Sequence, residues 1–378
     1  MFGKRIKLFK LFGFEVKIDA SWLIIALLVS WTLATGVFPH YYPGLKASTY
    51  WIMGIFGVIG LFVSIIAHEF FHSFVARRFG LPMHGITLFI FGGVAEMSDE
   101  PPNAKTELYM AIAGPVTSVA LGFIFYLSQR FGIASGWPQA VTGTLGYLKI
   151  INWVLAAFNL VPAFPLDGGR ILRAVLWKQK NNLEWATHVS SRIGRLFGGF
   201  LIFTGILYIL LGAFIGGMWW ILIGMFLRGI SGASYRRVLM RKTFEGEPVS
   251  KFMKEKPVTA PPQATVRELV EDYIYRYHHK MFPVETDNRV TGCVTSDDIK
   301  NIPKDEWDKR KVADISKPCS KDNTVGPDTD AMKALSVMSR SGKTRLMVIK
   351  DDKLKGIISL RDLLKLFSLK MDIEGSVE

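Results

Sequence analysis

The sequence predicts a chain of two parts. The first is an α-helical polytopic membrane domain with about six transmembrane helices and a small membrane-associated β-hairpin, and the second is a soluble α/β domain. Two observations support this division. Hydrophobic residues make up 49% of the 378 residues, and the long uncharged runs all lie before Arg228. After Arg228 no such run occurs, and the chain instead contains one sequence pattern twice.

Five uncharged runs are long enough, or nearly long enough, to cross a bilayer, which takes about 20 apolar residues in a helix. The longest contains the segment GAFIGG, so we expect it to fold back there into two spans. The five runs cover residues 20–38, 48–67, 108–128, 150–166 and 196–227. Residues 1–17, which precede them, mix basic and apolar side chains and predict an interfacial strand or short helix at the inner leaflet.

The net charge of +14 indicates the orientation of the spans. With a cytoplasmic N-terminus, 19 Lys and Arg residues fall in segments predicted to be internal, and only Lys46, Arg130 and Lys149 fall in external ones. Basic residues collect on the cytoplasmic side of membrane proteins. No nucleic-acid-binding motif accompanies the charge. We therefore expect a multi-pass protein of the cell membrane, embedded in the lipid bilayer, with a cytoplasmic N-terminus and soluble part and no nucleic-acid partner.

The second uncharged run ends in ionisable residues, which are costly at membrane depth and normally signal a function. His68, Glu69 and His72 form the pattern H-E-x-x-H. Residues i and i+4 of a helix share a face, so both imidazoles can bind one ion with Glu69 beside it. Zinc suits neutral imidazole, and a catalytic zinc site takes three protein ligands and leaves a fourth position for water. The alternative is a pair of core histidines bonded to neighbouring backbone.

This pattern also suits hydrolysis. Zinc lowers the pKa of a bound water to about 7, and Glu69 can take the proton of that water and pass it to a leaving amine. The site still needs a third ligand. Asp167, in the segment NLVPAFPLDGGR at residues 159–170, is predicted at about the depth of the histidines, because both spans run from outside to inside. The alternative is a capping Asp at a turn between helices, and position alone leaves the two interpretations equal.

Together these motifs make the chain similar to a known family. H-E-x-x-H in one span, N-x-x-P-x-x-P-L-D-G-G in a later one and A-G-P at residues 113–115 resemble the site-2 protease family of intramembrane zinc metalloproteases. The resemblance covers roughly residues 1–235. It implies hydrolysis of peptide bonds in or near a transmembrane segment of a membrane-anchored protein substrate.

The resemblance also implies roles for individual residues. His68, His72 and Asp167 would bind one Zn2+ ion per chain, and Glu69 would be the catalytic general acid and base. Asn159 would lie in the active site and position substrate or stabilise the developing oxyanion.

A hairpin is expected between the two motifs, because the apolar segments of GITLFIFGGVAEM, residues 85–97, flank Gly92 and Gly93. A substrate helix hides its peptide bonds and must unwind before water can attack. An exposed strand edge near the zinc can hold the substrate extended by strand addition. The alternative is a hairpin that closes the cytoplasmic mouth of the site.

The soluble part repeats internally. VTGCVTSDDIKNI, residues 290–302, aligns with LKGIISLRDLLKL, residues 354–366, so that Gly292 and Gly356 stand 64 positions apart. Each copy is one supersecondary unit with a helix-like stretch, two strands around a turn and a final helix. The two copies resemble a tandem CBS pair, a regulatory module that commonly binds adenine nucleotides. The two cysteines of the chain, Cys293 and Cys319, show no metal-type spacing, and we assign them no role.

Each CBS repeat ends in G-h-h-[ST]-x-x-D, where h is apolar, which gives Thr295 with Asp298 and Ser359 with Asp362. A hydroxyl and N–H groups at a helix start suit a phosphate, and the Asp can accept hydrogen bonds from ribose hydroxyls. We expect ATP, ADP or AMP to bind here and regulate activity. The alternative is an ordinary capped helix start in a purely structural or dimerising pair, because Ser/Thr-x-x-Asp is also a capping sequence. A homodimer through the CBS domains is a further expectation.

These motifs predict the domain limits. The protease domain covers residues 1–235, the linker 236–248, the CBS pair 249–370 and the tail 371–378. The two repeats begin and end at about 249–306 and 312–370.

The main alternative function is a CBS-gated divalent-metal transporter or channel. Such a protein would use His68, His72 and Asp167 as a transient metal site. Glu69 favours the peptidase, because a transporter needs no general base beside its ligands.

Overall fold

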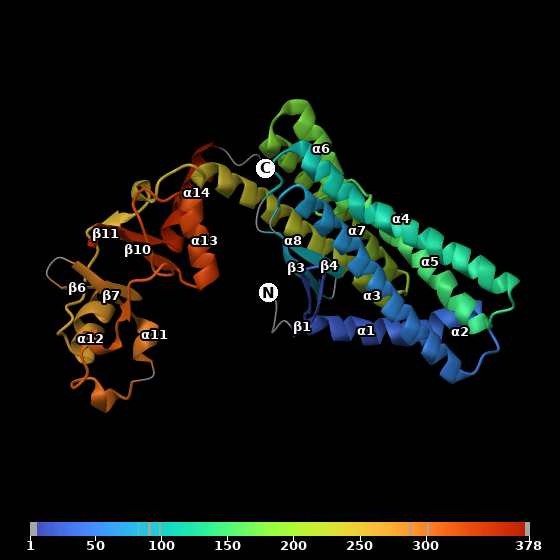
Figure 1. The fold of residues 1–378 in the computed structure, drawn as a ribbon, viewed down its shortest axis with the longest axis horizontal. Coiled ribbons are helices and arrows are strands. Elements are labelled where there is room, and N and C mark those ends of the chain that lie inside the picture. The colour runs from blue at the N-terminus through green and yellow to red at the C-terminus, as the bar shows by residue number, and fades with distance from the viewer. Residues whose placement is uncertain are drawn as a thin grey trace. The chain divides into compact units, whose positions relative to one another are not determined.

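The computed structural model describes residues 6–81, 83–89, 92–97, 100–286, 289–300 and 302–374. The chain divides into two compact units, Met1–Arg236 and Arg237–Glu378, and each is described by itself (Figure 1).

Six described helices are long and apolar enough to cross a membrane, as the sequence predicts. The first is continuous through a π-helical turn, and the others are single helices. Many of their large apolar side chains point outward, where lipid would contact them. The helices are Ser21–Tyr41 (α1, Ser21–Thr32; η1, Leu33–Val37; α2, Phe38–Tyr41), α3 (Ala47–Arg78), α4 (Ala104–Ala134), α5 (Gln139–Asn159), α7 (Leu183–Leu210) and α8 (Phe214–Phe244).

The fourth span lies earlier in the sequence than expected, because α5 covers Gln139–Asn159 instead of 150–166. Lys149 set the expected start, since a charge normally ends an apolar run. In the structure, its ammonium donates a hydrogen bond to Oε1 of Gln129 at 2.9 Å and lies 5.8 Å from the ring centre of Tyr126. A lysine with such partners is accommodated inside a helix. The helix ends early because the next segment contains two prolines, which lack the N–H that a helix requires.

A four-stranded sheet combines the N-terminal segment with the expected hairpin, in the order β1-β2-β3-β4. The N-terminal segment is therefore a pair of strands and not a helix. β2 and β3 run parallel, and the other two neighbouring pairs are antiparallel. β4 forms one edge of the sheet and packs along α3. The strands are β1 (Ile6–Leu11), β2 (Phe14–Ile18), β3 (Met83–Phe89) and β4 (Gly92–Met97).

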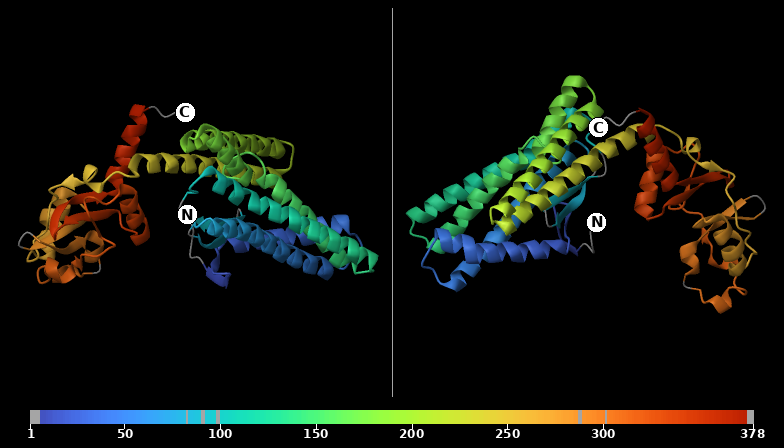
Figure 2. Two further views of the ribbon diagram at one scale, coloured as in Figure 1. Left: turned by 45° about the horizontal axis from the view of Figure 1, so that its top comes forward. Right: turned by 180° about the vertical axis from the view of Figure 1, so that it is seen from behind.

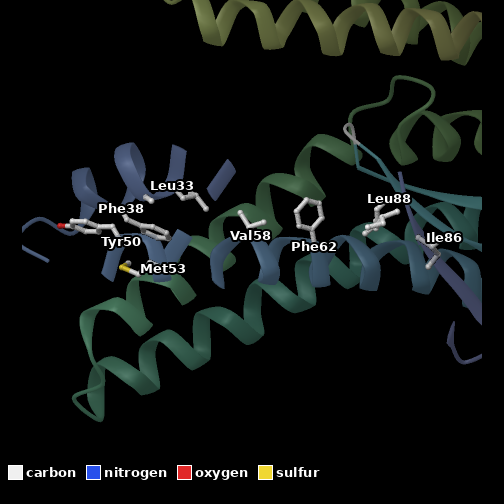
Figure 3. Close-up of a cluster of buried hydrophobic side chains, with 10 residues drawn as sticks. Leu33, Phe38, Tyr50, Met53, Val58, Phe62, Ile86 and Leu88 are labelled. Atoms are coloured by element: carbon white, nitrogen blue, oxygen red, sulfur yellow. The ribbon is translucent and has the colours of Figure 1, made fainter. Parts of the chain in front are cut away.

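A cluster of buried hydrophobic side chains joins α3 to α1, α2 and the sheet (Figure 3). Met53, Val58 and Phe62 contribute from α3, and Ile86 and Leu88 contribute from β3. This packing fixes α3 on one side, while α4 and α5 pack against it as well. α4 and α5 lie side by side along their length (Figure 2).

A short helix, α6 (Asp167–Lys180), follows the turn after α5 and begins with Asp167. The turn is covered by α7 and α8, because Ala163 and Leu166 share a hydrophobic cluster with Leu201 and Leu227. Ser231 on α8 also donates a hydrogen bond to the carbonyl oxygen of Phe164 at 2.5 Å. The position of Asp167 is thus set by packed segments on both sides of it in the sequence.

The second unit contains two sheets that correspond to the two repeats, with orders β6-β7-β8 and β5-β11-β10-β9. Each sheet contains one long antiparallel pair: β6 (Met281–Thr286) with β7 (Arg289–Thr295), and β10 (Arg345–Lys350) with β11 (Lys353–Ser359). The first strand of each repeat crosses to and pairs with the sheet of the other repeat, so β5 (Lys254–Glu255) pairs with β11 and β8 (Lys317–Pro318) pairs with β7. The remaining elements are η2 (Val249–Lys251), α9 (Val266–Glu268), η3 (Leu269–Ile274), α10 (Tyr275–Tyr277), α11 (Ser296–Ile299), η4 (Lys304–Glu306), α12 (Val312–Ile315), β9 (Thr324–Val325), α13 (Ala331–Ser341) and α14 (Leu360–Glu374).

The repeated glycines occupy equivalent places. Gly292 pairs with Pro318 of the crossing strand, and Gly356 pairs with Glu255. The ends of two helices differ from the domain limits that the sequence predicts. α8 continues through most of the expected linker to Phe244, and α14 continues to Glu374, while residues 375–378 of the expected tail lie outside the described residues.

Candidate metal centre

Three buried side chains from two helices converge at one point. His68 and His72 project from α3, and Asp167 is the first residue of α6. The two Nε2 atoms lie 3.1 Å apart, and each lies 3.1 Å from Oδ2 of Asp167. The ligand atoms therefore form an equilateral triangle, and no other group of this kind occurs among the described residues.

The triangle has the size and chemistry of a zinc site. A tetrahedral zinc ion with bonds of about 2.0–2.1 Å separates its ligand atoms by roughly 3.3 Å. The observed sides are close to this separation. Two imidazoles and one carboxylate also form the type of donor set that occurs in catalytic zinc sites, which keep a fourth position open.

Each histidine ring has a hydrogen-bond partner at Nδ1, the nitrogen that points away from the centre of the triangle. Nδ1 of His72 lies 2.6 Å from the carbonyl oxygen of Met110, which can only accept a hydrogen bond. Nδ1 of His72 therefore carries a proton, which is the tautomer that offers the Nε2 lone pair to a metal ion. Nδ1 of His68 lies 2.8 Å from Oγ of Ser118. A ring held in this way by its second nitrogen is typical of a metal-binding histidine.

Both ring partners belong to α4, and Gly114 lies midway between them on the same face of the helix. A Cβ atom added at Gly114 would lie 2.1 Å from Nε2 of His72 and 2.5 Å from Nε2 of His68. These separations are shorter than any real contact of a methyl group. The middle residue of A-G-P therefore has to be glycine for the two imidazoles to keep their positions.

We expect Gly114→Ala to lose bound zinc, because the methyl group would occupy the space beside both ligand nitrogens. Metal analysis of the purified variant measures this directly. Gly229→Ala is the matched control, because a Cβ there meets nothing within 4 Å. A zinc content in Gly114→Ala equal to that of the control would contradict the geometry.

The carboxylate of Glu69 lies beside the edge strand of the sheet. Glu69 directly follows His68 in α3. A Cβ added at Gly93 of β4 would lie 2.6 Å from Cγ of Glu69. Within the described part of the chain, no hydrogen bond or ion pair engages this carboxylate. Its oxygens are therefore available to a water molecule.

Comparison with known proteins decides the family. Residues 56–134 and 128–201 match the model of Peptidase family M50, and residues 249–305 and 312–369 each match that of the CBS domain. The zinc metalloprotease MJ0392 of Methanocaldococcus jannaschii is 30% identical over 366 residues, which cover 96% of each chain. The chain belongs to peptidase family M50.

A further relative agrees with this assignment. Rip3 of Mycobacterium tuberculosis is 31% identical over 366 residues, which cover 96% of this chain and 93% of that protein. The solved structure of the site-2 protease from Methanocaldococcus jannaschii is 29% identical, covers 61% of this chain and 94% of its own, and superimposes with a TM-score of 0.42.

The predicted resemblance and fold class are thus confirmed. This M50 peptidase is a zinc metallopeptidase of the site-2 protease type and a multi-pass membrane protein with tandem CBS domains. The alternative of a metal transporter does not agree with the family.

Asn159 of this M50 peptidase is the last residue of α5. Its amide donates a hydrogen bond to the carbonyl oxygen of Leu155 at 3.0 Å. Among the hydrogen bonds of the described residues, none joins Asn159 to the three converging side chains. The role that the resemblance implies for it stays a prediction.

The four residues expected to bind nucleotide pair with one another within each repeat. The backbone N–H and the hydroxyl of Thr295 donate to Oδ2 of Asp298 at 2.8 and 2.5 Å. The hydroxyl of Ser359 donates to Oδ2 of Asp362 at 2.6 Å. The structure thus shows the helix-capping arrangement, which leaves the expected ligand role untested.

A lysine from the crossing strand accompanies each of these carboxylates, which sequence reasoning missed. Nζ of Lys317 on β8 lies 2.5 Å from Asp298, and Nζ of Lys254 on β5 lies 3.4 Å from Asp362. Burial by itself would raise the pKa of Asp298, but the hydrogen bonds from Lys317 and Thr295 outweigh it and lower the pKa below its usual value. The same balance of burial against Ser359 and Lys254 lowers the pKa of Asp362.

Proposed function

We propose that this M50 peptidase cleaves a peptide bond in or near a transmembrane segment of a membrane-anchored protein. His68, His72 and Asp167 hold the zinc ion in this proposal, and Glu69 is the general acid and base. The convergence of the three ligand atoms beside Glu69 carries the proposal.

In the proposed hydrolysis, the metal ion and the side chains around it have separate roles. A zinc ion bound by the three atoms supplies a Lewis acid and lowers the pKa of a water molecule to about 7. Glu69 takes a proton from the attacking water and delivers it to the leaving amine. Met110 and Ser118 keep the histidine rings in place through Nδ1. Asn159 positions the substrate or stabilises the oxyanion in this scheme.

Glu69→Gln should abolish cleavage while zinc stays bound, because the ligands survive and only the proton carrier is lost. General acid and base groups contribute about 100- to 10,000-fold to rates, so a loss of that size is expected. The measurement is cleavage of single-span substrates together with metal analysis of the same preparation. Near-normal cleavage by this variant would show that Glu69 is not the general acid and base.

Asp167→Ala should lose both metal and activity, because two imidazoles remain where three ligands are needed. Metal analysis of the purified variant shows whether Asp167 is a zinc ligand or only a helix-capping residue. A full zinc complement in the variant would reduce Asp167 to the residue that starts α6.

We further propose that the outer edge of β4 holds the substrate in extended form. The sheet order gives β4 one partner, β3, so its other edge is free of strands in the described part of the chain. Gly93 on this strand lies against Glu69. A segment added along the edge would receive backbone hydrogen bonds in place of those it loses on unwinding. The alternative remains a hairpin that closes the site.

Gly93→Ala should impair cleavage and leave zinc in place, because the new methyl group would push against Cγ of Glu69 without touching a ligand. We expect a loss of about tenfold or more in kcat, since small displacements of a catalytic group are costly. Gly229→Ala again serves as the control. Unchanged kcat in Gly93→Ala would show that Glu69 needs no fixed position beside β4.

We also propose the orientation, domain limits and assembly expected from the sequence. The distribution of Lys and Arg supports a cytoplasmic N-terminus and cytoplasmic CBS domains. The proposed limits remain 1–235, 236–248 and 249–370, and a homodimer through the CBS domains is proposed with them.

Finally, we propose that the CBS pair binds ATP, ADP or AMP and thereby regulates cleavage. The support is the equivalence of the two repeats, each with a hydroxyl, a carboxylate and a nearby lysine. A nucleotide can shift the enzyme only if it binds one arrangement of the chain better than another.

Adenine nucleotide should alter cleavage by the full-length protein, by about 5- to 150-fold if the coupling is of ordinary size. Asp298→Ala combined with Asp362→Ala should remove this effect and leave the activity without nucleotide unchanged. Calorimetry with ATP, ADP and AMP tests binding independently. If none of the three binds, the pair is a structural or docking module.

A further inference from the structure

A buried ion pair joins α4 to α6 close to the metal centre. Arg173 on α6 is only 3% exposed, and Glu107 on α4 is fully buried. Nε of Arg173 donates a hydrogen bond to Oε1 of Glu107 at 2.6 Å, and Nη2 contacts the same oxygen. Nη2 also donates to Oε2 of Glu100 at 3.2 Å. No part of the mechanism above uses these charges.

The same guanidinium contacts the turn that leads to Asp167. Its Cζ lies 5.1 Å from the ring centre of Phe164, three residues before Asp167. Arg173 itself lies six residues after Asp167, on the same short helix. The arginine therefore fastens both the turn and the helix, on either side of Asp167, to one residue of α4.

Asp167 depends on this attachment more than the histidines do. Both histidines share α3 with each other, and their rings are held by Met110 and Ser118 of α4. Among the described residues, the carboxylate of Asp167 forms hydrogen bonds with His68 and His72 alone. Its place therefore depends on where α6 lies on α4, in addition to the packing of α7 and α8 over the preceding turn.

We propose that Arg173 is a positioning residue for the metal centre. Its pair with Glu107 fixes α6 on α4 at the distance that brings the carboxylate of Asp167 to His68 and His72. This inference rests on the proposed role of Asp167 as the third zinc ligand. Glu107 lies on the same buried face of α4 as Gly114, so one helix positions all three ligands.

Loss of Arg173 takes from the buried Glu107 carboxylate its hydrogen-bonded partner and leaves it the more distant Arg170, whose Nε lies 3.9 Å from Oε1, so the two helices relieve the poorly paired charge by separating or by admitting water. Either response moves Asp167 away from the histidines. An exposed pair has no such effect, because its charges are already hydrated. Arg267, which lies 2.5 Å from Asp308 on the surface of the second unit, provides that comparison.

The test uses full-length protein in detergent and measures two properties of the metal centre besides activity. Competition with a chelator gives the zinc affinity, and the visible spectrum of the cobalt-substituted protein reports the ligand geometry. We expect Arg173→Gln to weaken zinc binding at least tenfold and to change the cobalt spectrum. Arg267→Gln, the matched control, should match wild type in both.

Arg173→Lys is the conservative variant, because exchanging the two charges would bring a carboxylate at position 173 against Glu100 and a guanidinium at position 107 against Arg170. If Arg173→Gln does not fold, Arg173→Lys replaces it. A lysine keeps the charge but lacks the planar fork of donors, so a smaller change in both readouts is expected.

The outcomes separate this inference from the proposed function. If Asp167→Ala loses zinc but Arg173→Gln and Arg173→Lys keep wild-type affinity and spectrum, the positioning role is wrong and the ligand set stands. If Asp167→Ala binds zinc as well as wild type, the ligand set is wrong and the inference falls with it.

Discussion

Three electron-rich atoms held 3.1 Å apart in a protein interior repel one another unless a proton or a metal cation lies between them. The rest of the first unit can be understood as the framework that withstands this repulsion. α3 provides two of the atoms, and its opposite side is fixed by the hydrophobic cluster around Phe62. α4 provides a carbonyl, a hydroxyl and a glycine along one face, and these orient the rings without filling the space between them. α7 and α8 contribute no ligand, but they cover the turn before Asp167 and so fix the third atom.

Local spacing explains which parts of this site were predictable. His68 and His72 are four residues apart, so the period of the helix alone brings them to one face. Asp167 is 95 residues beyond His72, and no local rule brings the two together. Its predicted depth in the membrane fitted a third metal ligand and a helix-capping residue equally well. Glu107 and Arg173 are 66 residues apart and fall in stretches that look like ordinary helix ends, so nothing in the sequence marked them as partners.

Elsewhere a local sequence pattern was misleading or fitted two structures equally well. Lys149 looked like the end of a span, although its partner Gln129 on the preceding helix lets it lie inside one. In the CBS repeats, Thr295 with Asp298 fits both a capping box and a ligand site, because both uses need a hydroxyl and a carboxylate in the same places. The strands that carry Lys254 and Lys317 cross to the other repeat, a pairing that a linear comparison of the two copies does not show.

The parallel pairing of β2 with β3 has a consequence for how the chain is made. The two strands are separated in the sequence by two spans, Ser21–Tyr41 and α3. They become neighbours only after both spans have been synthesised and inserted, so that the chain has returned to the side of the membrane from which it started. Until then, the N-terminal strands β1 and β2 lack their partner β3. Asp167 is synthesised later still, after two more spans. With the proposed ligand set, a nascent chain therefore holds both histidines in the membrane before the third ligand is made, and the site cannot be complete until α5 has been synthesised.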